Sequence, residues 1–203
     1  MCSIIRPKLL SALLLTGASA LCYDGQYFFD TDHAEGQSGT QSNSISVDIA
    51  TPASPTVDEF ALGVMKGIQQ IFGFKDDAGE PMNQSAASFQ VQIPVSYMGV
   101  ALEAVTALLG TGGKSNTLPA LKGKFTIDVV TNPRLTWTDK FAIIRTDSAA
   151  KAFVLQEEDI PDVVALGEGS EYEQLNREQL FGIDWTGNVG FGFWQHACLV
   201  TFT

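Results

Sequence analysis

The sequence predicts a mixed α+β protein, and two patterns support this prediction. After Thr56 apolar residues recur at helical spacing, and from Lys124 onward short apolar segments separated by turn residues are typical of strands. With 203 residues, the chain is long enough for one domain, or one domain with a lobe, and for a core that needs no disulfides.

The composition indicates a globular protein and disfavours two kinds of partner. Apolar residues make up 45% of the chain, and no apolar run reaches the roughly 18 residues that a membrane helix needs. The net charge is -11, and the basic residues are scattered, with no group larger than a close pair such as Lys122 and Lys124, which disfavours binding to a phosphate backbone. The cysteines, Cys2, Cys22 and Cys198, form no disulfide framework or CxxC pattern, which suits a reducing compartment.

The first 22 residues allow two interpretations. A basic start, the apolar run from Leu9 to Leu15 and small residues up to Ala20 fit a secretory signal that is cleaved after Ala20. The same residues also predict a buried helix, in which Pro7 suits the first turn and Gly17 ends it. The residues alone leave both interpretations open.

A loop and a helix follow. Residues 34–55 are rich in Gly, Ser, Thr, Asn and Pro, and they predict a loop with one short strand at residues 45–49. Thr56 and Glu59 form a capping box, which predicts the start of a helix that ends at Gly73.

A strand and a second helix are expected next. Alternating apolar residues and glutamines predict a strand at residues 89–93, and Ser96 can cap a largely buried helix that runs to about Leu109. The segment GTGGKS at residues 110–115 resembles the end of a phosphate-binding loop, but Leu108 stands where that motif needs its first glycine. A loop that ends the helix is therefore the better prediction.

The C-terminal part predicts strands and turns. Strands are expected at residues 125–131, 140–146, 151–156 and 162–166, with turns near residues 132–133, 147–148 and 159–161. From Arg177 onward a long strand pair is expected to turn near residues 186–188. Five aromatic residues lie in this pair and predict a core or a subunit interface rather than a face that binds bases or sugars: Phe181, Trp185, Phe191, Phe193 and Trp194.

No pattern in the sequence amounts to an active site. Asp30, Asp32 and His33, with Asp24 nearby, could hold a metal, but such a cluster is also what an exposed Asx-type turn looks like. The acids at residues 157–159 fit a charged surface bend better than an acid–base pair. No catalytic residue, cofactor-binding residue, metal ligand or cofactor is predicted.

Four segments in order resemble the second part of the Mu-like phage major head subunit family. They are LCYDGQYFFDTDH (21–33), GFKDDAGEPMN (73–83), FVLQEEDIPDVVAL (153–166) and LFGIDWTGNVGFGFWQ (180–195). In that family these places carry a tyrosine-aspartate-glycine loop, a FFDTDHP-like turn, a GFKDD-type turn and a closing glycine- and aromatic-rich strand. Ala34 stands where the family has proline, and the resemblance covers roughly residues 5–203.

The resemblance implies the tailed-phage major capsid fold of the Hong Kong ninety-seven type. It implies residues 1–22 as the end of the spine helix, 23–55 as a loop and strand of the peripheral lobe, 56–165 as the axial lobe and 166–203 as closing strands of the peripheral lobe. This mapping favours the helix over the signal peptide, and Leu10, Leu13 and Leu14 should then pack on the closing aromatic strands. Family members carry an arm, an extended loop and most of the spine helix before this part, so a form truncated at the N-terminus is expected.

The function that the resemblance implies is structural. The chain would be a subunit of an icosahedral phage head that self-assembles into the shell enclosing the genome, located in the virion after synthesis in the bacterial cytoplasm. Its expected partners are identical subunits in pentameric and hexameric rings, other head proteins and, weakly if at all, the enclosed DNA, but no membrane. The alternative is an exported β-rich binding module with a cleaved signal peptide.

Overall fold

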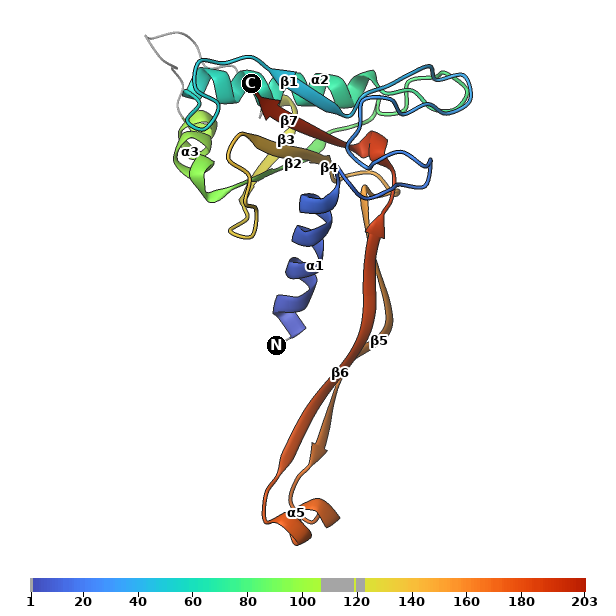
Figure 1. Cartoon of the computed structure of the whole chain (residues 1–203), viewed down its shortest axis with the longest axis vertical. Helices are drawn as coiled ribbons and strands as arrows, with labels where there is room; N and C mark the ends of the chain where they lie inside the picture. The colour runs from blue at the N-terminus through green and yellow to red at the C-terminus, as the bar shows by residue number, and fades with distance from the viewer. Residues whose placement is uncertain (1, 107–118, 120–122) are drawn as a thin grey trace.

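The described part of the protein consists of a compact body around a sheet and a long hairpin that projects from it (Figure 1). The structure is a computed structural model and describes residues 2–106, 119 and 123–203. Helices and strands are both present, which confirms the α+β prediction. We call the two parts the sheet body and the hairpin.

A five-stranded sheet in the order β1-β7-β4-β2-β3 forms the centre of the sheet body. Its strands are β1 (Ser44–Val47), β2 (Ser88–Ile93), β3 (Thr126–Thr131), β4 (Lys140–Arg145) and β7 (Ala197–Phe202). The pairs β1 with β7 and β2 with β3 are parallel, whereas β4 pairs antiparallel with both β2 and β7. The last strand of the chain thus lies inside the sheet, and its side chains are almost all buried.

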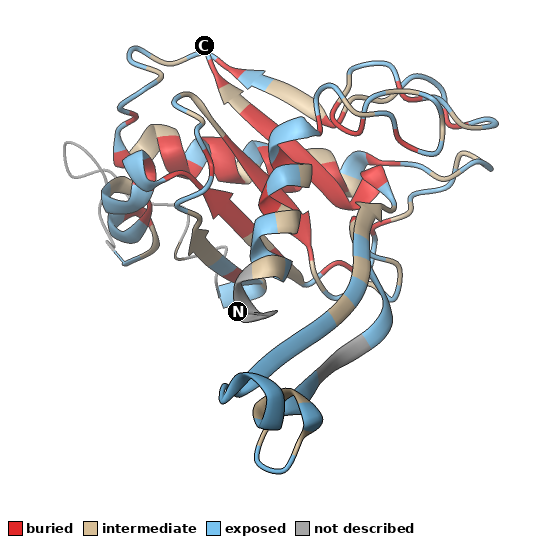
Figure 2. Ribbon diagram, turned by 60° about the horizontal axis from the view of Figure 1, so that its bottom comes forward, coloured by how far each residue is buried: buried red, intermediate tan, exposed pale blue. Residues whose placement is uncertain are grey.

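The helix α2 (Val57–Gly73) covers one face of this sheet, and both of its predicted ends are confirmed. The Thr56 hydroxyl accepts a hydrogen bond from the Glu59 amide, and the Glu59 carboxylate accepts one from the Thr56 amide at 2.8 Å, so the capping box is complete. The helix buries one apolar stripe, formed by Phe60, Val64, Ile68 and Ile71. Buried residues gather in the sheet and in this helix (Figure 2).

The second predicted helix is present but is far less buried than expected. A short 3-10 turn, η1 (Val95–Tyr97), leads into α3 (Met98–Thr106), of which only Ala101 and Ala104 are buried. Val100 and Val105 are partly buried against the core, whereas Leu102 is 62% exposed. The predicted end of this helix at Leu109 and the loop at residues 110–115 lie outside the described residues.

One long hairpin stands where the sequence predicted two short strands, at residues 151–156 and 162–166, and a separate strand pair after Arg177. It pairs β5 (Phe153–Leu166) with β6 (Leu180–Phe191), and a short helix, α5 (Glu171–Asn176), lies at its tip. The turns predicted at residues 159–161 and 186–188 were wrong: both segments are strand, and the register shifts between Glu157 and Asp162. Both strands are edges, where proline and bulges are tolerated, so turn-type residues do not break the pairing.

The helix α1 (Cys2–Thr16) lies on the opposite side of the sheet from α2 and ends just before Gly17, as predicted. Leu14 belongs to the core and Leu13 is half-buried. The helix α1 contacts the closing strand β6, and Leu10 lines a groove together with Phe153 and Val189. The packing expected for Leu10, Leu13 and Leu14 themselves stays a prediction. No helix among the described residues combines the length and apolar character that a membrane crossing requires.

The five-stranded sheet combines strands from several of the predicted segments, whose lobe boundaries remain a prediction. Residues 23–55 and 166–203 contribute β1 and β7 to the same sheet as β2, β3 and β4 of residues 56–165. The strand pairing of β5 with β6 also crosses the boundary at residue 165. Hydrogen bonding therefore joins strands that are distant in the sequence.

Candidate functional site

The motifs that carry the family resemblance meet where the hairpin enters the sheet body. The loop Asp24–Glu35, Asn83 and the 3-10 turn η3 (Trp194–His196) lie together there, and we call this site the motif junction. Trp194 is fully buried at its centre. The His33 imidazole stacks on the Trp194 indole, with the ring centroids 4.1 Å apart and the planes at 9°.

The acidic residues that a metal site would need act as hydrogen-bond acceptors in this loop. Nδ1 of the buried His33 lies 2.6 Å from Oδ2 of Asp24. Asp30 accepts hydrogen bonds from the backbone amides of Tyr27 and Thr31, and Asp32 is exposed. The Asx-type turn is made by Asp24, whose Oδ1 accepts from the Gln26 amide two residues on at 3.2 Å. Within the described residues, no group of three or more His, Cys, Asp or Glu side chains is placed to hold a metal ion.

Glu35 links the loop to the closing strand. Its carboxylate accepts hydrogen bonds from the Tyr23 hydroxyl, from Nε1 of Trp194 at 3.1 Å and from Nε2 of Gln195 at 3.2 Å. Burial, together with the hydrogen bond to Glu35, raises the pKa of Tyr23, so its hydroxyl remains a donor.

Asn83 joins the second motif to the same site. Its Nδ2 donates to the carbonyl oxygens of Ile71 at 2.7 Å and Gln195 at 2.8 Å, and its Oδ1 accepts from Nη1 of Arg145 at 2.9 Å. Arg145 is buried and also donates from Nε to Asp147 at 2.7 Å. Its charge is therefore paired inside the sheet body.

Asn43 has a similar role that the sequence did not reveal. It is fully buried, its Nδ2 donates to the carbonyl oxygens of Phe28 and Trp194, and its Oδ1 accepts from the Asp30 amide at 2.9 Å. Asn43 lies in the polar segment predicted as loop, where one asparagine among many polar residues gives no pattern that marks it as buried.

The junction is suited to holding segments together rather than to chemistry. Its polar groups bond mainly to one another and to the backbone, and it fixes the root of the hairpin to the sheet body. Burial raises the pKa of Cys22 to about 11, and burial also raises the pKa of Cys198. Neither thiol is therefore a thiolate nucleophile at neutral pH.

The hairpin, in contrast, exposes apolar side chains along its length. They include Val154, Leu155, Val164, Leu166, Leu175, Leu180, Phe181 and Ile183. The predicted aromatic cluster is thus spread out, since Trp194 is buried in the junction while Phe181 is 65% exposed. Residues 153–191 also contain nine acidic residues and one basic residue, a net charge of -8 out of -11 for the chain.

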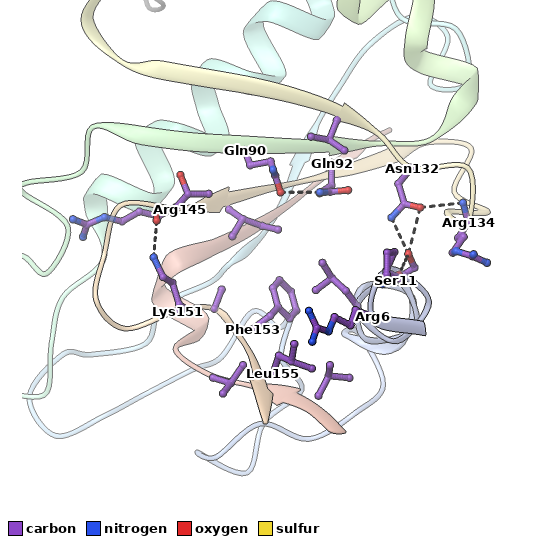
Figure 3. A pocket seen from close by; sticks show the side chains of 18 of the residues that line it. Arg6, Ser11, Gln90, Gln92, Asn132, Arg134, Arg145, Lys151, Phe153 and Leu155 are labelled. Carbon is purple, nitrogen blue, oxygen red and sulfur yellow. Dashed lines mark hydrogen bonds between the residues drawn. The ribbon is translucent and has the colours of Figure 1, made fainter. Parts of the chain in front are cut away.

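A groove of about 800 Å³ lies between α1, the sheet and the root of the hairpin (Figure 3). Its lining is mostly apolar and includes Leu10, Phe153 and Leu155. Arg6 of α1 pairs with Glu157 of β5, which ties the helix to the hairpin. The Trp185 indole and Arg6 lower the pKa of Glu157, so this acid is an ion-pair partner rather than part of the predicted bend.

Comparison with known protein families gives a direct assignment. Residues 3–57 and 119–201 match the family described as "Mu-like prophage major head subunit gpT". The chain belongs to this family. In this chain the motif junction is one of the places where the two matched ranges contact each other, because His33 lies in the first and Trp194 in the second.

Solved phage capsids agree with this gpT family assignment at the level of fold. A mature capsid chain of bacteriophage PhiM1 has a TM-score of 0.52 and 11% identity, and the match covers 97% of this chain and 61% of that one. A capsid chain of cyanophage P-SCSP1u has a TM-score of 0.51 and 11% identity, with coverage of 81% and 54%. A procapsid chain of bacteriophage JBD30 is 19% identical with coverage of 98% and 41%, but its TM-score of 0.43 adds no support to the fold assignment.

The fold is therefore that of tailed-phage capsid proteins, as predicted. The chain spans 41% to 61% of the length of these three capsid chains. No curated protein matches it significantly.

Proposed function

We propose that this chain is a structural subunit of an icosahedral phage head, which assembles with identical subunits into the shell that encloses the genome. Family membership supports this proposal. The structural observation that carries it is that the hairpin exposes many large apolar side chains to solvent. An isolated two-stranded hairpin is marginally stable in water, and large exposed apolar areas mark interaction sites. Neighbouring subunits would cover the apolar side chains of the hairpin.

The finer features of this proposal follow from the layout of the two parts. We propose that residues 56–165 form the axial lobe near the centre of a pentameric or hexameric ring, and that residues 23–55 and 166–203, with the spine helix of residues 1–22, form the peripheral lobe. The enclosed DNA would be contacted weakly, because the chain carries a net charge of -11. Other head proteins are further partners, and the protein would reside in the virion after synthesis in the bacterial cytoplasm.

A role without catalysis is part of the same proposal. The buried thiols are protonated at neutral pH, and Glu35, Asn83 and Asp24 of the motif junction are engaged in structural hydrogen bonds. The exported binding module is less well supported, since cleavage after Ala20 would remove Leu14 from the core.

Sedimentation velocity and negative-stain electron microscopy of the purified chain test the proposal. Rings or larger closed assemblies are expected to increase with protein concentration. A chain that remains monomeric at every concentration tested would contradict the proposal. A mature N-terminus at Leu21, measured by mass spectrometry, would support the exported module instead.

A further inference from the structure

We propose that the groove is the seat for the hairpin tip of a second copy of this chain, an inference that rests on the proposed shell function. The tip comprises residues 167–181, including α5. The contact would join two different surfaces, the tip of one subunit and the groove of the next.

The groove has the shape and lining of a docking site. Its volume of about 800 Å³ would take roughly five side chains of the size that fills a 150 Å³ cavity. Its mostly apolar lining comes from α1, the sheet and the root of the hairpin. No segment among the described residues fills it.

A buried polar atom in the groove wall points to a missing partner. Gln92 is 5% exposed and lines the groove, and its Nε2 donates to Oε1 of Gln90 at 2.8 Å (Figure 3). Its own Oε1 has no hydrogen-bond partner within the described part of the chain. Buried acceptors are normally satisfied, so a donor from an incoming segment would complete this site.

The charges of the groove rim fit an acidic partner. Arg134 and Lys151 lie at opposite ends of the groove, and both are exposed (Figure 3). Neither forms an ion pair with a carboxylate among the described residues, and Lys151 donates only to the Thr146 carbonyl oxygen, at 2.7 Å. Both cations are therefore available to carboxylates of another chain.

The hairpin tip offers the complementary surface. Leu175 is 76% exposed and Phe181 is 65% exposed, and these are among the most exposed large apolar side chains of the described residues. The tip also carries four acids and a single base: Glu168, Glu171, Glu173, Glu178 and Arg177. Apolar anchors inside an acidic rim match an apolar groove with a basic rim.

The tip cannot reach the groove of its own subunit. The groove lies at the root of the hairpin, and the paired strands β5 and β6 carry α5 away from it to the far end of the molecule (Figure 1). Contact must therefore be made with another copy. A contact between two different surfaces propagates from subunit to subunit and closes into a ring when the rotation allows it.

Charge-reversal variants of the full chain test this contact by sedimentation velocity. The groove variant Arg134→Glu/Lys151→Glu and the tip variant Glu171→Lys/Glu178→Lys should each raise the concentration needed for association at least about tenfold. An equimolar mixture of the two variants should restore association, because each reversed surface then meets its opposite. The control Lys66→Glu/Lys75→Glu changes the charge as the groove variant does, but on exposed lysines outside the groove, and should associate like the wild type.

The outcomes separate this inference from the proposed function. If the wild type assembles and both reversed variants assemble equally well, the tip–groove contact is wrong while the shell function stands. If the wild type never assembles, both the tip–groove contact and the proposed shell function are wrong. Leu175→Ser is a second tip variant that leaves the charge unchanged; it should weaken association, and unchanged association by this variant would also overturn the contact.

Discussion

The buried pair of Asp24 and His33 is the residue-scale feature most open to test. Asp24→Ala removes the carboxylate that lies 2.6 Å from Nδ1 of His33 and leaves a buried ring nitrogen without its partner. Loss of a charge-assisted hydrogen bond of this kind should lower the free energy of unfolding by about 2–3 kcal/mol, as measured by urea denaturation. Asp32→Ala, an exposed neighbour in the same motif, should change it by less than about 0.5 kcal/mol. Equal effects of the two substitutions would refute this structural role.

His196 predicts how stability depends on pH. It is buried, and its Nδ1 has no hydrogen-bond partner among the described residues. Burial, with the nearby charge of Arg145, lowers the pKa of His196 from 6.5 to about 4. Between these pH values the unfolded chain binds a proton that the folded chain does not, so the free energy of unfolding falls as pH drops through 6.5 towards 4. At pH 5 this loss should be about 2 kcal/mol relative to its value above pH 7.

The variant His196→Leu isolates this contribution. It cannot take up the proton in either state, so its stability should fall less than that of the wild type between pH 7.5 and pH 5, when both are measured by urea denaturation. Hydrogen bonds from Arg145 and from the Ala87 amide lower the pKa of Asp147, so this acid titrates below pH 5. Its contribution is the same in the wild type and in the variant. A parallel decline of the two proteins would contradict the assignment to His196.

At the residue scale, the sequence revealed clusters of neighbouring residues but not contacts between residues that are far apart in the chain. Asp24, Asp30 and His33 were recognised as one cluster, and the Asx-type turn was among the interpretations. The stacking of His33 on Trp194 was not predictable, because the two residues are 161 positions apart and only the fold brings them together. The family resemblance linked their motifs in order but did not give the contact.

At the scale of elements, Gly192 lies where the hairpin strand β6 ends and the chain enters the sheet body. A Cβ atom at this position would clash with the carbonyl oxygen of Lys151, a backbone atom that cannot rotate away. Gly192→Ala should therefore lower the thermal midpoint and the free energy of unfolding by about 2 kcal/mol or more. Gly190→Ala, two residues earlier and inside β6, has open space around its Cβ and should be nearly neutral. Comparable losses for both variants would show that the close approach is not what matters.

Elements with strong local signals were predicted well, and those that depend on distant pairing were not. The capping box fixes the start of α2, and its apolar stripe at helical spacing fixes its face. The hairpin contains Asp, Pro and Gly at residues 159–161 and 186–188, which locally favour turns. Pairing with a partner strand overrides these preferences, since Thr186 faces Asp159 and Gly187 faces Glu157 across the hairpin.

At the scale of the whole molecule, stability and association are divided between the two parts. The buried core lies in the sheet body and the junction, and between residues 157 and 187 no described side chain belongs to it. The hairpin holds most of the net negative charge of the chain together with exposed apolar side chains. Repulsion between copies would thus be strongest in the part proposed to make contact, which explains why a basic groove rim would be needed there.

Shortening the hairpin separates these two roles. Replacing residues 157–187 by an Asn-Gly turn between the paired Gln156 and Asn188 should leave the sheet body folded, because no described core residue is removed. Near-UV circular dichroism should be retained, and the thermal midpoint should change by only a few degrees, about what 1 kcal/mol produces. Sedimentation velocity should show that association is lost. If the shortened chain unfolds, the hairpin is part of the folding unit; if it assembles like the wild type, contacts of the sheet body alone hold the subunits together.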